Sequence, residues 1–95
     1  MLKNSERINV YASIDPMKLS GLHQAGYILS CMVEGQSREA TITKFKGDEQ
    51  LVQMWTLFVV HNHWVERDRF GAIALTEKGR RHLEEYKSTL TVKLH

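Results

Sequence analysis

The sequence predicts a mainly α domain with a small β-hairpin, which places it in the α+β fold class. Apolar residues recur at helical spacing over 16–33 and 49–61, which indicates two amphipathic helices. Alternating apolar residues over 64–75 surround a turn that contains glycine, a pattern typical of a β-hairpin. Side chains that cap helix N-termini well precede the segments expected to be helical: Asp15, Ser37, Asp48 and Thr76.

The 95-residue chain has the size of one small domain, which we place at 15–86. Residues 1–14 are either an N-terminal arm or a strand, and residues 87–95 are either a C-terminal tail or a strand. No apolar run approaches the ~20 residues of a membrane span, so no membrane partner is expected. The single cysteine, Cys31, excludes an intramolecular disulfide framework and suits a reducing compartment. We therefore expect a cytoplasmic protein.

The first predicted helix covers 16–33. It follows Asp15, an N-cap residue succeeded by proline at the first helical position, and it ends before Gly35. Gly21 and Gly26 each weaken the helix by ~1 kcal/mol relative to alanine, and they would allow another helix to approach closely. The expected apolar side of this helix comprises Leu22, Ala25, Leu29, Met32 and Val33.

Two further helices are predicted over 38–45 and 49–61, joined by a turn at Lys46-Gly47. This spacing is typical of a helix–turn–helix. The expected packing residues of the shorter helix are Ala40, Ile42 and Phe45. On a helical wheel, the longer helix has a broad apolar face made by Leu51, Met54, Trp55, Phe58 and Val59. Its opposite face carries Glu49, Gln53, Thr56 and Val60.

The predicted hairpin begins near Trp64, turns at 69–71, where glycine permits a positive φ, and returns through Ile73 and Leu75. A last helix then begins after its N-cap, Thr76. Its inward residues are expected to be Leu83 and Tyr86.

The C-terminal segment 89–94 alternates apolar and polar residues again. It is predicted to be either a terminal strand, paired with residues 8–12, or a weakly packed tail.

Residues 15–86 resemble a winged helix-turn-helix domain of the kind found in MarR-type and PadR-type transcriptional regulators. The resemblance is based on the order of elements and on the phrase Leu-Thr-Glu-Lys-Gly at 75–79. It implies that 49–61 is a recognition helix in the major groove of double-stranded DNA and that the hairpin is a wing. The implied contacts at the wing are Arg67 and Arg69, beside Asp68. The implied phosphate contacts are Ser37, Arg38, Thr41, Thr43, Lys44 and Lys46, and the implied base contacts are Gln50, Gln53 and Thr56.

The resemblance leads to two hypotheses about function. The first is a small DNA-binding transcriptional regulator that acts as a homodimer, because a second half-site adds affinity. The second is a protein-interaction module, such as an adaptor, an anti-repressor or an assembly subunit. No Lys or Arg occurs over 47–66, and the helix 49–61 has an acidic start at Asp48-Glu49, which favours the second. The protein partner would then contact Leu57 and Val60 on the outward side of the helix 49–61.

No catalytic or cofactor-binding pattern is present in the chain. His61 and His63 are two residues apart, which is not the paired spacing of a zinc site, so we expect no metal, no cofactor and no enzymatic activity. The aromatic residues Trp55, Phe58 and Trp64 are interpreted as core rather than as a ligand pocket. The pair at 80–81, Arg-Arg, suits either a phosphate contact or an exposed helix face.

Overall fold

The structure is a computed structural model that describes residues 14–94, with side-chain surroundings through Leu90. It is mainly helical with one two-stranded antiparallel sheet, which confirms the predicted α+β class. Residues 1–13, where an arm or strand was expected, lie outside the described residues. The elements in chain order are the 3-10 helix η1 (Pro16–Lys18), α2 (Gly21–Val33), α3 (Arg38–Lys44), α4 (Glu49–His61), β1 (Val65–Arg67), β2 (Ile73–Leu75) and α5 (Glu77–Leu94).

The helix predicted over 16–33 is two elements rather than one. Asp15 caps η1 as expected, because its carboxylate accepts a hydrogen bond from the backbone N–H of Met17 at 2.9 Å. The chain then becomes extended at Leu19 and Ser20, and Ser20 is the N-cap residue of α2. Gly21 has a φ of +32° and no atom near the position of a Cβ. This glycine therefore marks the break between the two elements and makes no close helix contact.

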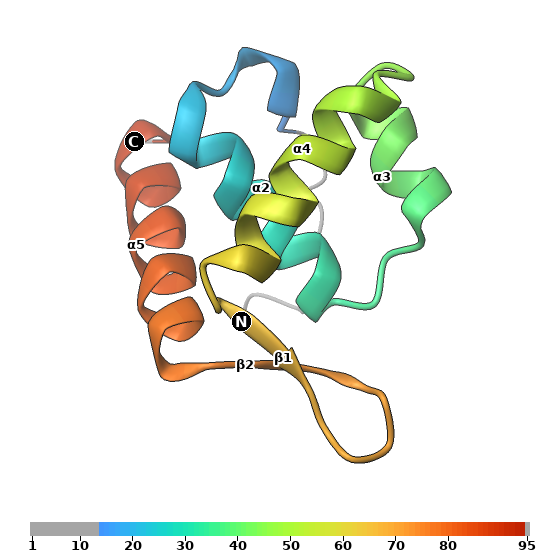
Figure 1. Ribbon diagram of the computed structural model, residues 1–95. Coiled ribbons are helices and arrows are strands. Elements are labelled where there is room, and N and C mark those ends of the chain that lie inside the picture. The colour runs from blue at the N-terminus through green and yellow to red at the C-terminus, as the bar shows by residue number, and fades with distance from the viewer. Residues whose placement is uncertain (1–13, 95) are drawn as a thin grey trace, which may run out of the picture.

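The buried side of α2 differs from the predicted side. Ala25 and Leu29 are fully buried, as expected, but Leu22 is 59% exposed and Val33 is 44% exposed. Every residue from Gln24 to Leu29 is buried, and so is Cys31. The reason is that α2 is the central helix: α4, α5, η1 and β2 all pack on it. Figure 1 shows α4 crossing in front of α2.

The helices α3 and α4 begin where the sequence placed them. Ser37 accepts a hydrogen bond from Ala40 N at 3.0 Å, and Asp48 accepts one from Leu51 N at 3.0 Å. Of the three packing residues expected for α3, Phe45 and Ile42 lie in or against the core, but Ala40 is exposed.

The core face of α4 is shifted from the predicted face. Val52 and Val59 are its fully buried residues, and Leu51, Trp55 and Phe58 pack against the core. Met54, which was predicted to be inside, is 49% exposed. Contacts with α2, α3 and β1 together determine which face of α4 is buried. This face does not extend as far toward Met54 as the helical wheel predicted.

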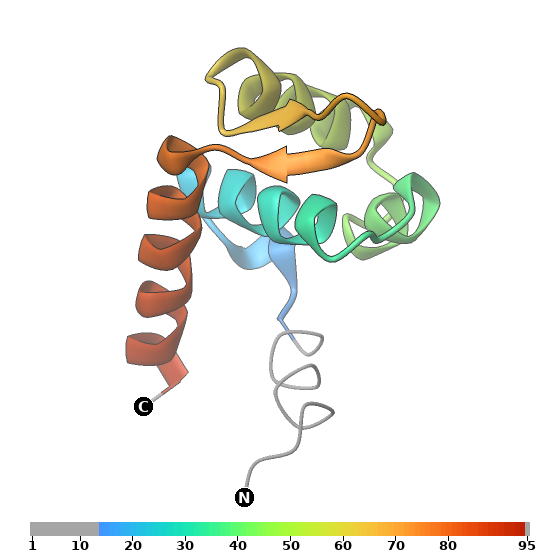
Figure 2. The same ribbon diagram turned by 90° about the horizontal axis from the view of Figure 1, so that it is seen from below.

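The hairpin and α5 complete the fold. The strands pair antiparallel with Val65 opposite Leu75 and Arg67 opposite Ile73. In α5, Leu83, Tyr86 and Leu90 are buried, and Figure 2 shows α5 crosswise to one end of α2. The strand predicted over 89–94 is wrong, because α5 continues to Leu94.

The same residues show why α5 continues. The steps from Leu83 to Tyr86 and from Tyr86 to Leu90 are three and four residues, which is the helical period. None of the helices within 14–94 combines the length and apolar character needed to cross a bilayer.

Candidate nucleic-acid interface

The Leu-Thr-Glu-Lys-Gly phrase joins three elements of the fold. The hydroxyl of Thr76 donates to the carbonyl of His63 and accepts from Gly79 N at 3.0 Å. The backbone N–H of Thr76 donates to the carbonyl of Trp64 at 3.0 Å. Thr76 is therefore the N-cap of α5, as predicted, and it also ties the end of α4 and the start of β1 to that helix. The contacts of Thr76 and Gly79 therefore have a structural role.

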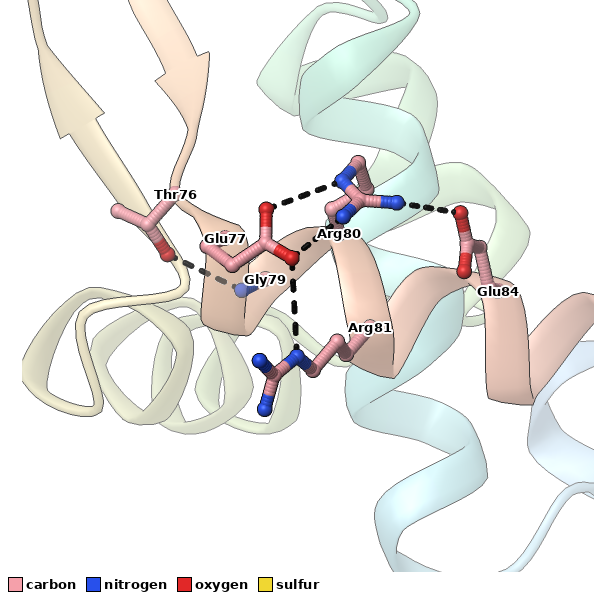
Figure 3. A network of polar contacts seen from close by, with 6 residues as sticks. All are labelled: Thr76, Glu77, Gly79, Arg80, Arg81 and Glu84. Atoms are coloured by element: carbon pink, nitrogen blue, oxygen red, sulfur yellow. Dashed lines mark hydrogen bonds and ion pairs between the residues drawn. The ribbon is translucent and has the colours of Figure 1, made fainter.

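The two arginines at the start of α5 belong to an ion-pair network (Figure 3). Arg80 pairs with Glu77 and, at 2.9 Å, with Glu84. The Nε atom of Arg81 lies 3.7 Å from the same carboxylate of Glu77. Because all these side chains are at least half exposed, the network contributes little to stability. It favours the interpretation of this pair as an exposed helix face.

The six residues predicted to contact phosphates do not form one free surface. Thr41, one of the predicted phosphate contacts, is buried, and its hydroxyl donates to the carbonyl of Ser37 at 3.0 Å. The hydroxyl of Thr43 donates to the carbonyl of Glu39 at 2.9 Å but stays exposed. Both bonds close one turn within α3, where threonine commonly bonds to its own helix. Ser37, Arg38 and Lys44 are exposed as expected.

Lys46 has a partner that the sequence did not indicate. Its ammonium lies 3.4 Å from the carboxylate of Asp15, and its side chain is 68% exposed. The hydrogen bond from Met17 N and this ammonium together hold the pKa of Asp15 below its ordinary value. An incoming phosphate would therefore compete with Asp15 for Lys46.

The outward side of α4 holds the predicted base contacts. Gln50 and Gln53 are exposed, and the side-chain oxygen of Gln53 accepts a hydrogen bond from Arg38 of α3 at 3.3 Å. Thr56, which was expected to be exposed, is half-buried, and its hydroxyl donates to the carbonyl of Val52 at 2.7 Å. Of the three, the two glutamines are therefore the ones available to a base edge.

An apolar strip runs along the same side of α4. Met54, Leu57 and Val60 are 49%, 45% and 41% exposed. They are spaced three residues apart, so they follow one another along the surface of the helix. Leu57 and Val60 lie there as predicted, whereas Met54 was missed. We call these three residues the α4 stripe.

The tip of the hairpin, residues 68–71, is held by hydrogen bonds. One carboxylate oxygen of Asp68 accepts from the backbone N–H of Phe70 at 2.8 Å and from that of Ala72 at 2.9 Å. The backbone of Asp68 bonds to Ala72 and Gly71, and Arg67 donates to the carbonyl of Gly71 at 2.8 Å. Asp68 therefore organises the tip, a role that the sequence did not indicate.

The tip also exposes an aromatic ring. Phe70 is 85% exposed, and the guanidinium of Arg69 lies 5.7 Å from the centre of its ring. The sequence interpretation treated Phe70 only as part of the turn. The sequence did contain a signal for this turn. Aspartate in a turn commonly bonds to the backbone two residues ahead, and here that position is an aromatic residue followed by glycine.

Trp55, Phe58 and Trp64 lie in or against the core, as predicted. The rings of Trp55 and Phe58, and those of Phe58 and Trp64, meet edge to face with centroids 5.4 Å apart. Trp64 stacks on His82 at 4.1 Å. The indole N–H of Trp55 donates to the side-chain oxygen of Gln24 at 2.9 Å. This cluster joins α2, α4, the residue before β1 and α5, so it holds the fold together.

Cys31 and the described histidines do not form a cluster that could serve as a further site. Cys31 is buried, and that burial raises the pKa of its thiol, which makes the reactive thiolate scarce at neutral pH. Within the described part of the chain, His, Cys, Asp and Glu side chains do not gather in threes that could hold a metal ion.

No family model, no curated protein and no solved structure gives a significant match to the chain. Three surfaces hold the predicted contact residues: α3 with its following turn, the outward side of α4, and the hairpin tip.

Proposed function

We propose that the chain is a small DNA-binding transcriptional regulator built as a winged helix-turn-helix. The observation that carries the proposal is the succession of α3, the turn 45–48, α4 and the hairpin. In a helix-turn-helix the second helix of the pair enters the major groove, and a hairpin that follows it can reach the neighbouring groove. Here α3 and β1 both pack on α4, so they flank it in the order that such a protein requires (Figure 1).

Cations in this arrangement lie beside α4 rather than on it. Arg38 and Lys44 are exposed on α3, and Arg67 and Arg69 are exposed on the hairpin. Because phosphate contacts supply most of the sequence-independent affinity, these flanks would hold the duplex. Gln53 would face the bases between them, since glutamine can pair bidentately with adenine.

We also propose that the chain acts as a homodimer in the cytoplasm. A single module of this size makes a modest DNA interface, and the acidic start of α4 weakens it further. Two copies on two half-sites would restore affinity, with a spacing of about one helical turn of DNA or a multiple of it.

The proposal is tested by binding to a random duplex at about 50 and 200 mM salt, since counterion release makes DNA binding fall steeply between these concentrations. Fluorescence anisotropy of a labelled duplex measures the affinity. The double variant Arg67→Ala/Arg69→Ala should flatten the salt slope by up to ~2. The matched control is Arg80→Ala/Arg81→Ala, which removes the same charge from arginines already paired with Glu77 and should leave the slope unchanged. Absence of salt-dependent binding by the unmodified protein would reject the proposal.

The α4 stripe favours a second candidate, a winged-helix protein-interaction module that acts as an adaptor, an anti-repressor or an assembly subunit. Its three apolar residues occupy the side of α4 that would enter the major groove, and no Lys or Arg occurs over 47–66. Exposed apolar residues that are grouped in this way commonly mark contact surfaces. In this candidate Leu57 and Val60 contact the partner, and the hairpin does not bind DNA.

A further inference from the structure

Phe70 is the most exposed large hydrophobic residue among those the structure describes. Its ring is 85% accessible to solvent, against 59% for Leu22, the next most exposed. Aromatic side chains contribute to folding when they are buried against other residues. A ring in this position adds little to the stability of the domain, so its placement is better explained by contact with another molecule.

The tip is built to present the ring. Three hydrogen bonds reach the backbone of the loop from side chains, two accepted by Asp68 and one donated by Arg67. Two more join backbone groups across the loop, from Asp68 to Ala72 and from Gly71 to Asp68. Gly71 takes a φ of +83°, which closes the turn without strain. Binding therefore needs little ordering of this loop, and preorganisation of that kind raises affinity.

The charges around the ring suit a polyanion. The guanidinium of Arg69 lies over the face of Phe70, and Arg67, one residue before Asp68, keeps N–H groups beyond the one bonded to Gly71. The carboxylate of Asp68 is turned into the loop, where two backbone N–H groups bond to one of its oxygens. Glu66 lies on the other face of the hairpin from Arg67, since successive strand residues alternate. The ring thus has the Arg69 guanidinium as its neighbour, and the Arg67 guanidinium is held at the same turn by its bond to the Gly71 carbonyl.

We infer that Phe70 is an apolar wedge that enters the minor groove of duplex DNA at a base step, with Arg69 on a neighbouring phosphate. This inference rests on the proposed function. Phenylalanine has no hydrogen-bonding group, so in the major groove it could make only apolar contact with a thymine methyl. In the minor groove, apolar side chains of its type insert between base pairs, unstack them and bend the duplex. Binding should therefore favour pyrimidine–purine steps, which deform easily.

The test measures affinity and bending together on one duplex that contains a central TA step. Anisotropy reports the affinity, energy transfer between end-labels reports the bend, and 2-aminopurine fluorescence at the step reports unstacking. Phe70→Ala should weaken binding about tenfold, in the range found when an aromatic side chain that stacks on a base is removed. It should also abolish the bend and the 2-aminopurine signal while leaving the salt slope unchanged.

Two variants control this test. Phe70→Leu keeps an apolar wedge and should retain most of the bend. Leu22→Ala removes another exposed apolar side chain, at the start of α2 and well away from the hairpin tip (Figure 1), and should change nothing. Since the ring of Phe70 is exposed, both substitutions at this position should leave the urea midpoint unchanged.

The outcomes separate this inference from the proposed function. If the unmodified protein binds DNA with a steep salt slope and Phe70→Ala keeps both affinity and bend, the wedge is wrong and the proposed function stands. If the unmodified protein binds no duplex, both are wrong. If Phe70→Ala abolishes self-association in sedimentation while the bend persists, the ring contacts protein, and the wedge is again wrong.

Discussion

Gly79 lies so close to Trp64 that a Cβ at this position would overlap the Trp64 carbonyl oxygen and lie 2.7 Å from its carbonyl carbon. That same carbonyl accepts the backbone N–H of Thr76 at 3.0 Å. The first turn of α5 therefore packs directly on the chain that enters β1. The φ of Gly79 is one that any residue can adopt. The glycine of the Leu-Thr-Glu-Lys-Gly motif is therefore required by this close contact and not by its backbone conformation.

Gly79→Ala should destabilise the protein by about 2 kcal/mol, within the range for overpacked sites. At an exposed helix position that makes no such contact, the same change would stabilise the protein by ~1 kcal/mol. A loss of stability would therefore show that Gly79 packs against Trp64. Backbone cannot swing aside as a flexible side chain can, and the hairpin must shift to make room. Urea unfolding measures the change. Ser88→Ala, at an exposed position of the same helix, should be neutral or slightly stabilising, and an equal result for both variants would contradict the contact.

Gly26 allows a second close approach, between α2 and α5. A Cβ at this position would lie 2.6 Å from the Tyr86 ring, so Gly26→Ala should cost about 2 kcal/mol in the unmodified protein. In a Tyr86→Ala background the ring is absent, and the same change should cost markedly less. A double-mutant cycle by urea unfolding should then give a coupling energy between ~0.5 and 3 kcal/mol. Additive effects would mean that the two helices do not meet at this point.

The sequence predicted the elements whose signals are local. The caps at Ser37 and Asp48 placed the starts of α3 and α4 correctly, because a capping side chain bonds within its own first turn. The close approach at Gly26 was also predicted. An internal glycine weakens a helix, so its presence there indicates that another helix packs closely.

Burial and termini were harder to predict, because tertiary contacts decide them. Leu22 is exposed and Gln24 is buried, since neighbours on several sides of α2 determine which residues lie inside. The segment 89–94 alternates like a strand, yet it belongs to α5, and Leu90 is buried there. At the candidate site, Thr41 and Thr56 turned inward to bond with their own helices, which the spacing of polar residues does not reveal.

Tyr27 makes stability depend on pH in the alkaline range. Burial, with smaller effects of Cys31 and Glu34, raises the pKa of Tyr27 to about 12, whereas an unfolded tyrosine has a pKa of about 10. Below pH ~10 the phenol is protonated in both states and its contribution is fully present. Between pH ~10 and 12 the unfolded state loses its proton first, so stability falls. The free energy of unfolding should drop less over this window in Tyr27→Phe, and equal slopes for the two proteins would contradict the shift.

The outward side of α4 distinguishes the two candidate functions. If α4 enters the major groove, Gln53→Ala should cost ~1–3 kcal/mol against the preferred site and relax base preference at one position. Because Gln53 accepts a hydrogen bond from Arg38, the two side chains would act as a unit, and their single substitutions should not add.

Val60→Asp tests whether the α4 stripe contacts a protein. Val60 is 41% exposed, so a carboxylate there remains hydrated in the free protein and should leave the urea midpoint nearly unchanged. In a desolvated protein contact the same charge is strongly unfavourable, and sedimentation would then show the loss of an assembly. Val33→Asp, at a similarly exposed valine that ends α2, supplies the matched control and should keep the assembly.

Under the proposed function we expect Gln53→Ala to lose sequence preference and Val60→Asp to keep its oligomeric state. The reverse pair of results would assign α4 to a protein partner, because a helix that reads bases cannot lie in a permanent protein interface.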